Sequence, residues 1–213
     1  MIKIQRKNRY SSVLFKDCIE DKQNKAVLSY LKDYLANIEE KISICENAVI
    51  CGELGVGKTM MTRALQNELR KIEVEEEIQT GNFDPYTQTY VKRQNIRKMT
   101  VQYISCANLI KALREHFSKD KEENKLYHDC DLLIVDEVGV QYGTTNERLT
   151  LNDLFNERYE NYKPVILVSN KELFKDKIPD DTDITDIMGW RIIDRINSGS
   201  SKYFYINGKS KRK

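Results

Sequence analysis

The chain has 213 residues, and 35 Lys and Arg against 33 Asp and Glu leave a formal net charge of +2. The length suits one domain, and a composition of 40% hydrophobic and 32% charged residues excludes a disordered chain. No apolar run reaches the roughly 20 residues of a membrane-spanning helix, and no apolar stretch follows the basic N-terminus, so we expect a cytoplasmic protein without membrane contact. The five cysteines form no C-x-x-C pair, which predicts reduced thiols and no zinc site.

The two ends of the chain are basic, although the whole chain is nearly neutral. Residues 1–10 and residues 209–213 each hold four basic residues and no acid, which leaves 27 basic and 33 acidic residues between them. We expect solvated ends that lie away from the phosphate site described below. If the ends bind a partner, their charge favours nucleic acid, with an affinity that falls steeply as salt is added.

Apolar periodicity predicts helices that alternate with short buried strands along most of the chain. The predicted helices cover residues 22–38, 59–72, 108–118, 149–162 and 184–196. The predicted strands cover residues 48–51, 99–104, 132–135, 165–168 and 203–206. Short, unbroken apolar strands between helices are typical of a parallel sheet that is covered on both faces, so we predict an α/β fold.

Residues 73–98 interrupt this alternation, because an acidic run is followed there by Gly81, Pro85 and then a basic run. A connection of this length is longer than α/β units usually need. One interpretation is a solvated surface excursion. The alternative is a hairpin that contacts a partner and whose acidic and basic limbs pair with each other.

A phosphate-binding motif lies between the first predicted strand and the next helix. Residues 52–59 read GELGVGKT, which is the P-loop pattern G-x-x-x-x-G-K-[ST] in its expected strand–helix setting. Glycines let the backbone approach a ligand closely, and the N–H groups of the loop and helix start bind phosphate oxygens. We expect ATP to be bound by Gly52, Gly55, Val56, Gly57, Lys58, Thr59 and Met60. Lys58 reaches the β- and γ-phosphates in this interpretation, and Thr59 binds Mg²⁺.

Polar residues follow two further buried strands, at the ends where parallel sheets bind ligands. Asp136 and Glu137 close the run LLIVDE. Asp136 suits Mg²⁺, held through water, and Glu137 can orient and deprotonate an attacking water. Asn170 follows the strand at 165–168 and either touches the γ-phosphate or the attacking water, or simply opens a turn.

Two arginines share one face of the last predicted helix, because Arg191 and Arg195 are four residues apart in GWRIIDRI. Arginines on an otherwise apolar helix need acids or phosphate as partners. Surface ion pairs are one interpretation. The other is an arginine finger that reaches the nucleotide of a neighbouring subunit.

With these motifs in order, the sequence resembles the AAA+ ATPases, and within them the bacterial and phage replicative-helicase loaders (the DnaC/DnaI-like group) and the related IstB transposition ATPases. The resemblance covers about residues 9–207 and is most specific in GELGVGKT, LLIVDEVGVQ and GWRIIDRI. It implies that Arg195 is the arginine finger and Arg191 a second arginine acting in trans or near the γ-phosphate. It also implies that Asn170 is the polar sensor residue and that Phe15 lies near the adenine.

The same resemblance implies a three-layer P-loop fold with a central parallel sheet and no C-terminal helical lid. Residues 1–45 then form a basic segment and lead-in helix, 46–207 the ATPase core with 73–98 as an insertion, and 208–213 a basic tail. In the family, a helix matching residues 108–117 binds single-stranded DNA, so Lys111, Arg114 and Phe117 are candidate DNA contacts. An ordinary amphipathic helix is the alternative for these three residues.

The function that these observations predict is slow ATP hydrolysis, stimulated by assembly or DNA, in the loading of a hexameric replicative helicase on single-stranded DNA. Self-association through the ATP site is part of this prediction, and ATP and Mg²⁺ are the expected ligands. Three alternatives stay open: an IstB-like transposition helper, a P-loop nucleotide kinase, and a non-catalytic DNA-binding or adaptor module. A kinase needs an acceptor site and has no need for the Asp136–Glu137 pair.

Overall fold

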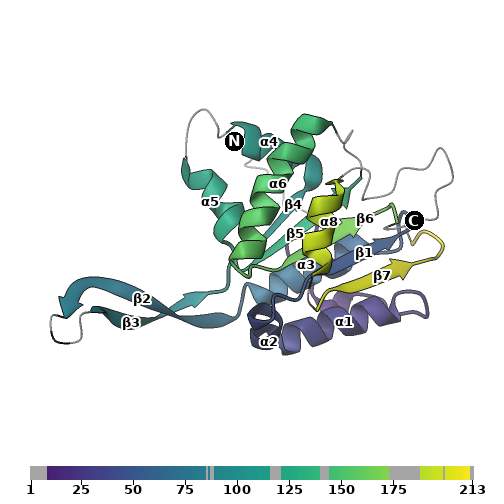
Figure 1. Cartoon of the computed structure of the whole chain (residues 1–213). Coiled ribbons are helices and arrows are strands. Elements are labelled where there is room, and N and C mark those ends of the chain that lie inside the picture. The colour runs from purple at the N-terminus through teal and green to yellow at the C-terminus, as the bar shows by residue number, and fades with distance from the viewer. Residues whose placement is uncertain are drawn as a thin grey trace, which may run out of the picture.

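The computed structural model describes residues 9–84, 86, 89–115, 121–139, 144–172, 188–198 and 200–211. Its central sheet has five parallel strands in the order β4-β5-β6-β1-β7 (Figure 1). These strands are β1 (Ala48–Gly52), β4 (Val101–Ser105), β5 (Leu132–Val138), β6 (Val165–Ser169) and β7 (Lys202–Ile206). All five predicted strands are therefore present, and the predicted parallel α/β fold is confirmed.

Helices cover both faces of the sheet, because successive strand residues point to opposite sides. Val49 and Cys51 join one apolar core, whereas Ala48 and Ile50 join the other. The first core is covered by α4 (Cys106–Glu115), α5 (Lys121–Asp129), α6 (Thr145–Glu160) and α8 (Trp190–Asn197). The second core is covered by the short helix η1 (Phe15–Asp17), α1 (Lys25–Ala36), α2 (Ile38–Ser43) and α3 (Lys58–Leu69). The result is a three-layer arrangement.

Several helices begin or end at other residues than the periodicity predicts. The helix predicted at 22–38 is divided into α1 and α2 at Asn37, and α6 begins four residues early because Thr144 and Glu147 form a capping box. The last helix was predicted from residue 184, but residues 173–187 lie outside the described part. Within the described part α8 begins only after Gly189, whose φ of 93° is outside the helical region.

The lead-in segment is part of the domain core rather than an appendage. The amide of Asn67 on α3 donates to the carbonyl oxygens of Tyr10 and Val13, and the backbone N–H of Phe15 donates to Glu68. Phe15 itself is buried in the same apolar cluster as the residues of α1 and α3. This segment therefore fixes α3, the helix that begins at the P-loop.

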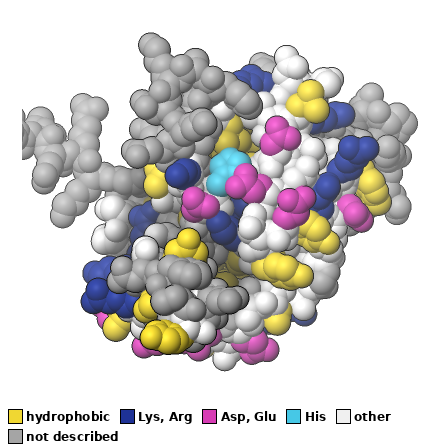
Figure 2. All heavy atoms as spheres, turned by 60° about the vertical axis from the view of Figure 1, so that its left-hand side comes forward, with side chains coloured by type: hydrophobic (Ala, Val, Ile, Leu, Met, Phe, Trp, Pro, Cys, Tyr) yellow, Lys and Arg dark blue, Asp and Glu magenta, His cyan; other side chains and the backbone are white. Residues whose placement is uncertain are grey.

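Residues 73–98 form a two-stranded antiparallel hairpin that projects from one end of the sheet (Figure 1). Its strands are β2 (Glu73–Asp84) and β3 (Thr89–Lys98). The acidic and basic limbs do pair, since Arg97 contacts Glu76 at 2.5 Å and Lys92 contacts Glu77 at 2.8 Å. Figure 2 views the molecule from the hairpin side and shows basic, acidic and hydrophobic side chains interspersed on that face. A contact between the hairpin and a partner stays a prediction.

All five cysteines are free thiols, as predicted. In the described part of the chain no helix is long and apolar enough to span a membrane. No helix follows β7 within the described residues up to 211.

Candidate nucleotide site

The P-loop lies at the carboxyl end of β1, which stands between β6 and β7 in the sheet, and leads directly into α3. Gly52, Gly55 and Gly57 all have positive φ angles, of 146°, 80° and 100°. A Cβ on Gly52 would lie 2.2 Å from the carbonyl oxygen of Ile206, so this position also needs a glycine for close packing against β7. Gly57 precedes the first residue of α3, whose open N–H groups make a site for phosphate oxygens.

The Lys58 side chain lies inside the loop and is only 6% exposed. Its Nζ donates to the carbonyl oxygens of Gly52 at 2.6 Å and Glu53 at 2.7 Å. The Val56 side chain is fully buried in the core, so only the backbone of Val56 can contact a phosphate. The predicted phosphate-binding residues thus surround one charged ammonium group.

Thr59 and Asp136 are 77 residues apart in the sequence, yet the Thr59 hydroxyl donates to Asp136 Oδ2 at 2.9 Å. The Asp136 carboxylate is nearly buried, and its Oδ1 accepts a hydrogen bond from the Glu137 N–H at 2.8 Å. Hydroxyl and carboxylate oxygens are the hard donors that Mg²⁺ prefers, so these two residues fit the ion. Within the described residues no group of three or more His, Cys, Asp or Glu side chains could hold a metal.

Tyr103 on β4 also contacts Asp136, and sequence patterns did not indicate it. Its hydroxyl donates to Asp136 Oδ2 and lies 3.4 Å from the Thr62 hydroxyl. Burial, and secondly the neighbouring Asp136 charge, raise the pKa of the Tyr103 hydroxyl. A tyrosine in a strand that is mostly apolar carries no functional signal by itself.

Glu137 is set apart from its strand neighbours by its backbone. Its φ is 56°, a left-handed value that costs a non-glycine residue about 1–3 kcal/mol. The β5–β6 ladder is irregular at this point, between Val135 and Val138. As a result the Glu137 side chain is exposed, whereas the residues on either side of it are buried. Strain of this kind gathers at functional sites, where it directs one side chain away from the sheet.

Asn170 directly follows β6, which lies between β5 and β1 in the sheet. The preceding Ser169 is buried, and its hydroxyl donates to the Val138 carbonyl at 2.6 Å. This bond ties the ends of β5 and β6 together. Asn170 is therefore exposed at the sheet edge that carries both the P-loop and Glu137, and its role as a sensor stays a prediction.

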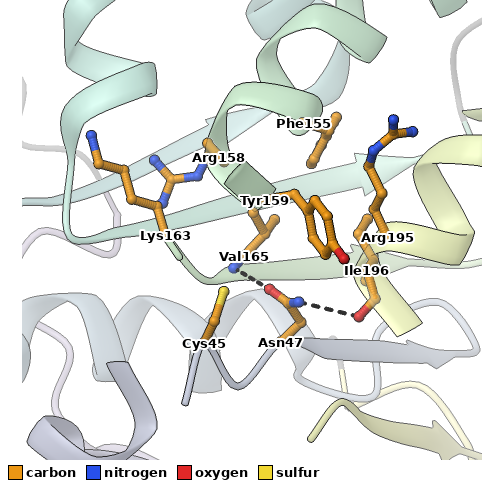
Figure 3. Close-up of a pocket in the computed structure, with 9 residues that line it drawn as sticks. All are labelled: Cys45, Asn47, Phe155, Arg158, Tyr159, Lys163, Val165, Arg195 and Ile196. Carbon is orange, nitrogen blue, oxygen red and sulfur yellow. Dashed lines mark hydrogen bonds between the residues drawn. The ribbon is translucent and has the colours of Figure 1, made fainter. Parts of the chain in front are cut away.

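Arg195 lies near the amino ends of the strands, at the opposite end of the sheet from the P-loop. It lines a small pocket with Asn47 and Val165, which stand at the amino ends of β1 and β6 (Figure 3). The Asn47 side chain accepts from the Val165 N–H at 2.8 Å and donates to the Ile196 carbonyl at 3.2 Å, which holds the end of α8 at this edge. Because β1 has five residues at about 3.3 Å each, Arg195 is separated from its own P-loop by about 16 Å of strand.

Arg191 lies one helical turn before Arg195 and is exposed. Arg195 is partly exposed, and its Nη1 donates weakly to the Arg191 carbonyl at 3.4 Å. Among the described residues neither arginine forms an ion pair, and the interpretation as surface ion pairs stays open. The role of each arginine stays a prediction.

The other predicted contacts are placed as follows. Phe15 is buried in the apolar cluster that also includes the P-loop residue Val56, and its contact with an adenine stays a prediction. Lys111 and Arg114 are exposed on α4, whose apolar side joins the core, which agrees both with a DNA contact and with an ordinary amphipathic helix. Phe117 lies outside the described residues.

The C-terminal tail contacts the P-loop, so the prediction that this basic end lies away from the phosphate site is wrong. The Lys211 N–H donates to the Gly55 carbonyl at 2.9 Å, and a Cβ on Gly55 would lie 2.1 Å from Ser210 Oγ. The Lys211 ammonium pairs with Asp21 at 2.5 Å and thereby helps to lower the Asp21 pKa. No sequence pattern predicts this contact, because it joins segments about 150 residues apart.

Comparison with known proteins finds a matching family model and several relatives. The family model described as IstB-like ATP binding protein matches residues 87–213, beginning after the P-loop. The replicative helicase loader DnaC of Escherichia coli K12 is 23% identical over 189 residues, which are 87% of this chain and 62% of that protein. The chain thus spans less than two thirds of the length of this relative.

Solved structures share the fold. A crystal structure of the DnaC helicase loader superposes with a TM-score of 0.69 at 16% identity, covering 94% of this chain and 99% of that one. AMPPCP-bound DnaA from Aquifex aeolicus superposes with a TM-score of 0.62 at 22% identity, covering 91% of this chain and 50% of that one. At these identities the likeness establishes the fold and nothing finer.

Proposed function

The chain belongs to the family of IstB-like ATP binding proteins, and from this premise we propose that it is an AAA+ ATPase that helps to load a replicative helicase on single-stranded DNA. The observation that carries the ATPase part is the contact between Thr59 and Asp136 at the P-loop, next to the strained Glu137. The helicase and DNA parts rest on the resemblance to the loaders.

Each residue of the site has a role in ATP hydrolysis. Lys58 and the loop N–H groups hold the β- and γ-phosphates, and Thr59 with Asp136 would hold Mg²⁺. When bound, Mg²⁺ neutralises charge that develops on the phosphate oxygens. Glu137 accepts a proton from the attacking water, whose oxygen bonds to the γ-phosphorus as the bond to the ADP oxygen breaks. Asn170 orients that water from the end of the neighbouring strand.

Arg195 supports a site shared between subunits. Its place at the amino edge of the sheet, with about 16 Å of strand between it and its own P-loop, suits a nucleotide on a neighbouring subunit. A neighbour in head-to-tail contact would present its P-loop edge to this arginine. Arg195 then stabilises the charge of the transition state, and Arg191 is a second cation on the same helix.

Mixing two inactive variants tests this arrangement. Lys58→Ala should abolish ATP binding, whereas Arg195→Ala should keep ATP affinity within about twofold and lose at least about 100-fold in turnover. In an equal mixture, about a quarter of head-to-tail interfaces join an intact P-loop to an intact arginine, so hydrolysis should return. Arg195→Ala turnover equal to that of the wild type, or a mixture as inactive as its components, would refute the shared site. Phosphate release with no added acceptor would exclude the nucleotide kinase.

The family match favours a second candidate function, that of a helper ATPase in transposition. A loading assay separates the two. The chain, ATP and a purified hexameric replicative helicase are incubated with circular single-stranded DNA, and helicase retained on the circle is measured. ATP-dependent retention that Lys58→Ala abolishes supports the loader. Retention equal with and without the chain, together with specific binding of a transposase, supports the helper.

A further inference from the structure

Tyr103 meets the metal-site aspartate from the neighbouring strand. In the β4–β5 register Tyr103 pairs with Ile134, and Asp136 lies two residues further along β5. Residues two apart on a strand point to the same face. Tyr103 and Asp136 therefore both face α3, and the Tyr103 side chain extends along the sheet far enough for its hydroxyl to donate to Asp136 Oδ2.

The aromatic ring is held on the α3 side as well. The Arg63 guanidinium lies 3.5 Å from the ring centroid, a close cation–π contact, and the Thr62 hydroxyl lies 3.4 Å from the phenol oxygen. Both partners belong to the helix that begins at the P-loop. The Tyr103 hydroxyl is thus placed by contacts on three sides rather than by Asp136 alone.

The Tyr103 hydroxyl limits which oxygen of Asp136 can accept further hydrogen bonds. An ionised carboxylate offers about four acceptor positions, two on each oxygen. Oδ2 accepts from both Thr59 and Tyr103, so its positions are filled. Oδ1 accepts from the Glu137 N–H and, counting donors in the described part of the chain, keeps one position open. With Tyr103 in place, Asp136 can receive a metal-bound water only on Oδ1.

We propose that Tyr103 is a positioning residue of the Mg²⁺ site, which fills Asp136 Oδ2 and so presents Oδ1 to the hydrated ion. The role rests on the proposed ATPase function, since it needs a nucleotide and Mg²⁺ at the P-loop. Hydrogen-bond partners behind a metal ligand fix its orientation, and their loss typically weakens metal affinity about 10- to 100-fold.

The test is Mg²⁺ titration of Tyr103→Phe, which removes one hydroxyl and keeps the ring under Arg63. Binding of a fluorescent ADP analogue is measured in EDTA and then across a Mg²⁺ series. The expected result is unchanged affinity in EDTA and a Mg²⁺ half-saturation raised about tenfold. The matched control is Tyr34→Phe, since Tyr34 is a buried tyrosine on α1 whose hydroxyl donates to the Glu46 carbonyl at 3.1 Å, away from the site. The control should keep the wild-type half-saturation.

Two results would overturn the role. One is a Tyr103→Phe half-saturation for Mg²⁺ equal to that of the wild type. The other is an equal loss of affinity in EDTA and in Mg²⁺, which would mean that the hydroxyl only supports the fold. If the nucleotide affinity of the wild-type chain does not change with Mg²⁺ concentration, the proposed function is refuted, and the role of Tyr103 with it.

Discussion

Arg158 on α6 is fully buried and holds several backbone segments together. Its Nη1 donates to the carbonyl oxygens of Tyr127 at 2.8 Å and Cys130 at 3.1 Å, and its Nη2 donates to that of Pro164 at 2.8 Å. These carbonyls belong to the last turn of α5 and to the segments that lead into β5 and β6. One guanidinium therefore fixes the amino ends of two central strands.

Replacing Arg158 with Met keeps much of the volume and removes these hydrogen bonds. Four carbonyls lose this donor, those of Tyr127, His128, Cys130 and Pro164. The Pro164 carbonyl still accepts from the Leu133 N–H at 3.3 Å, and each of the other three losses costs about 1–3 kcal/mol. Because the variant no longer has to bury a cation, the lower part of the summed range applies, about 3–5 kcal/mol. For a chain of this length that lowers the melting temperature by about 10 °C.

Urea unfolding followed by circular dichroism measures the free energy of unfolding of Arg158→Met and of a matched control. The control is Lys163→Met, because Lys163 lies close by and its Nζ pairs with Asp129 at 2.9 Å on the surface. An exposed pair of this kind contributes about 0–1 kcal/mol. A loss below about 1 kcal/mol for Arg158→Met, or equal losses for both variants, would refute the reasoning. If Arg158→Met does not fold, Arg158→Lys should fold with an intermediate stability.

Two further predictions concern the hairpin base and the tail. Burial alone would raise the pKa of Asp131, but hydrogen bonds from Arg97 and Thr100 outweigh it and lower the pKa below 3.8. The carboxylate therefore stabilises the fold above about pH 5, by about 1–2 kcal/mol, and loses this effect as the pH falls through the lowered pKa. The stability difference between Asp131→Asn and the wild type should therefore shrink steadily as the pH is lowered below 3.8. Deleting residues 209–213 removes the Lys211 N–H that donates to the Gly55 carbonyl, and this should weaken ATP binding several-fold. Lys211→Ala keeps that N–H and should bind ATP with wild-type affinity. Equal ATP affinities for the two variants would contradict the prediction.

The parts of the site that are formed by consecutive residues could be predicted from the sequence. GELGVGKT requires the loop geometry that the structure shows, because positive φ angles at Gly55 and Gly57 and a helix start at Lys58 are properties of neighbouring residues. The buried run ending in Asp136 likewise predicts a strand with an acid at its carboxyl end. For residues 73–98 the sequence is compatible with either a hairpin or a solvated loop, because charge runs alone do not distinguish paired limbs from a loop.

What depends on the tertiary structure is which distant residues meet. Strand order decides that β4 lies beside β5, and this brings the Tyr103 hydroxyl to Asp136 across 33 residues of sequence. The same folding separates Arg195 from its own P-loop and brings Lys211 onto Gly55. Periodicity reports only which face of an element is buried, whereas these contacts follow from strand order, register and helix placement, which the packing of the whole core determines.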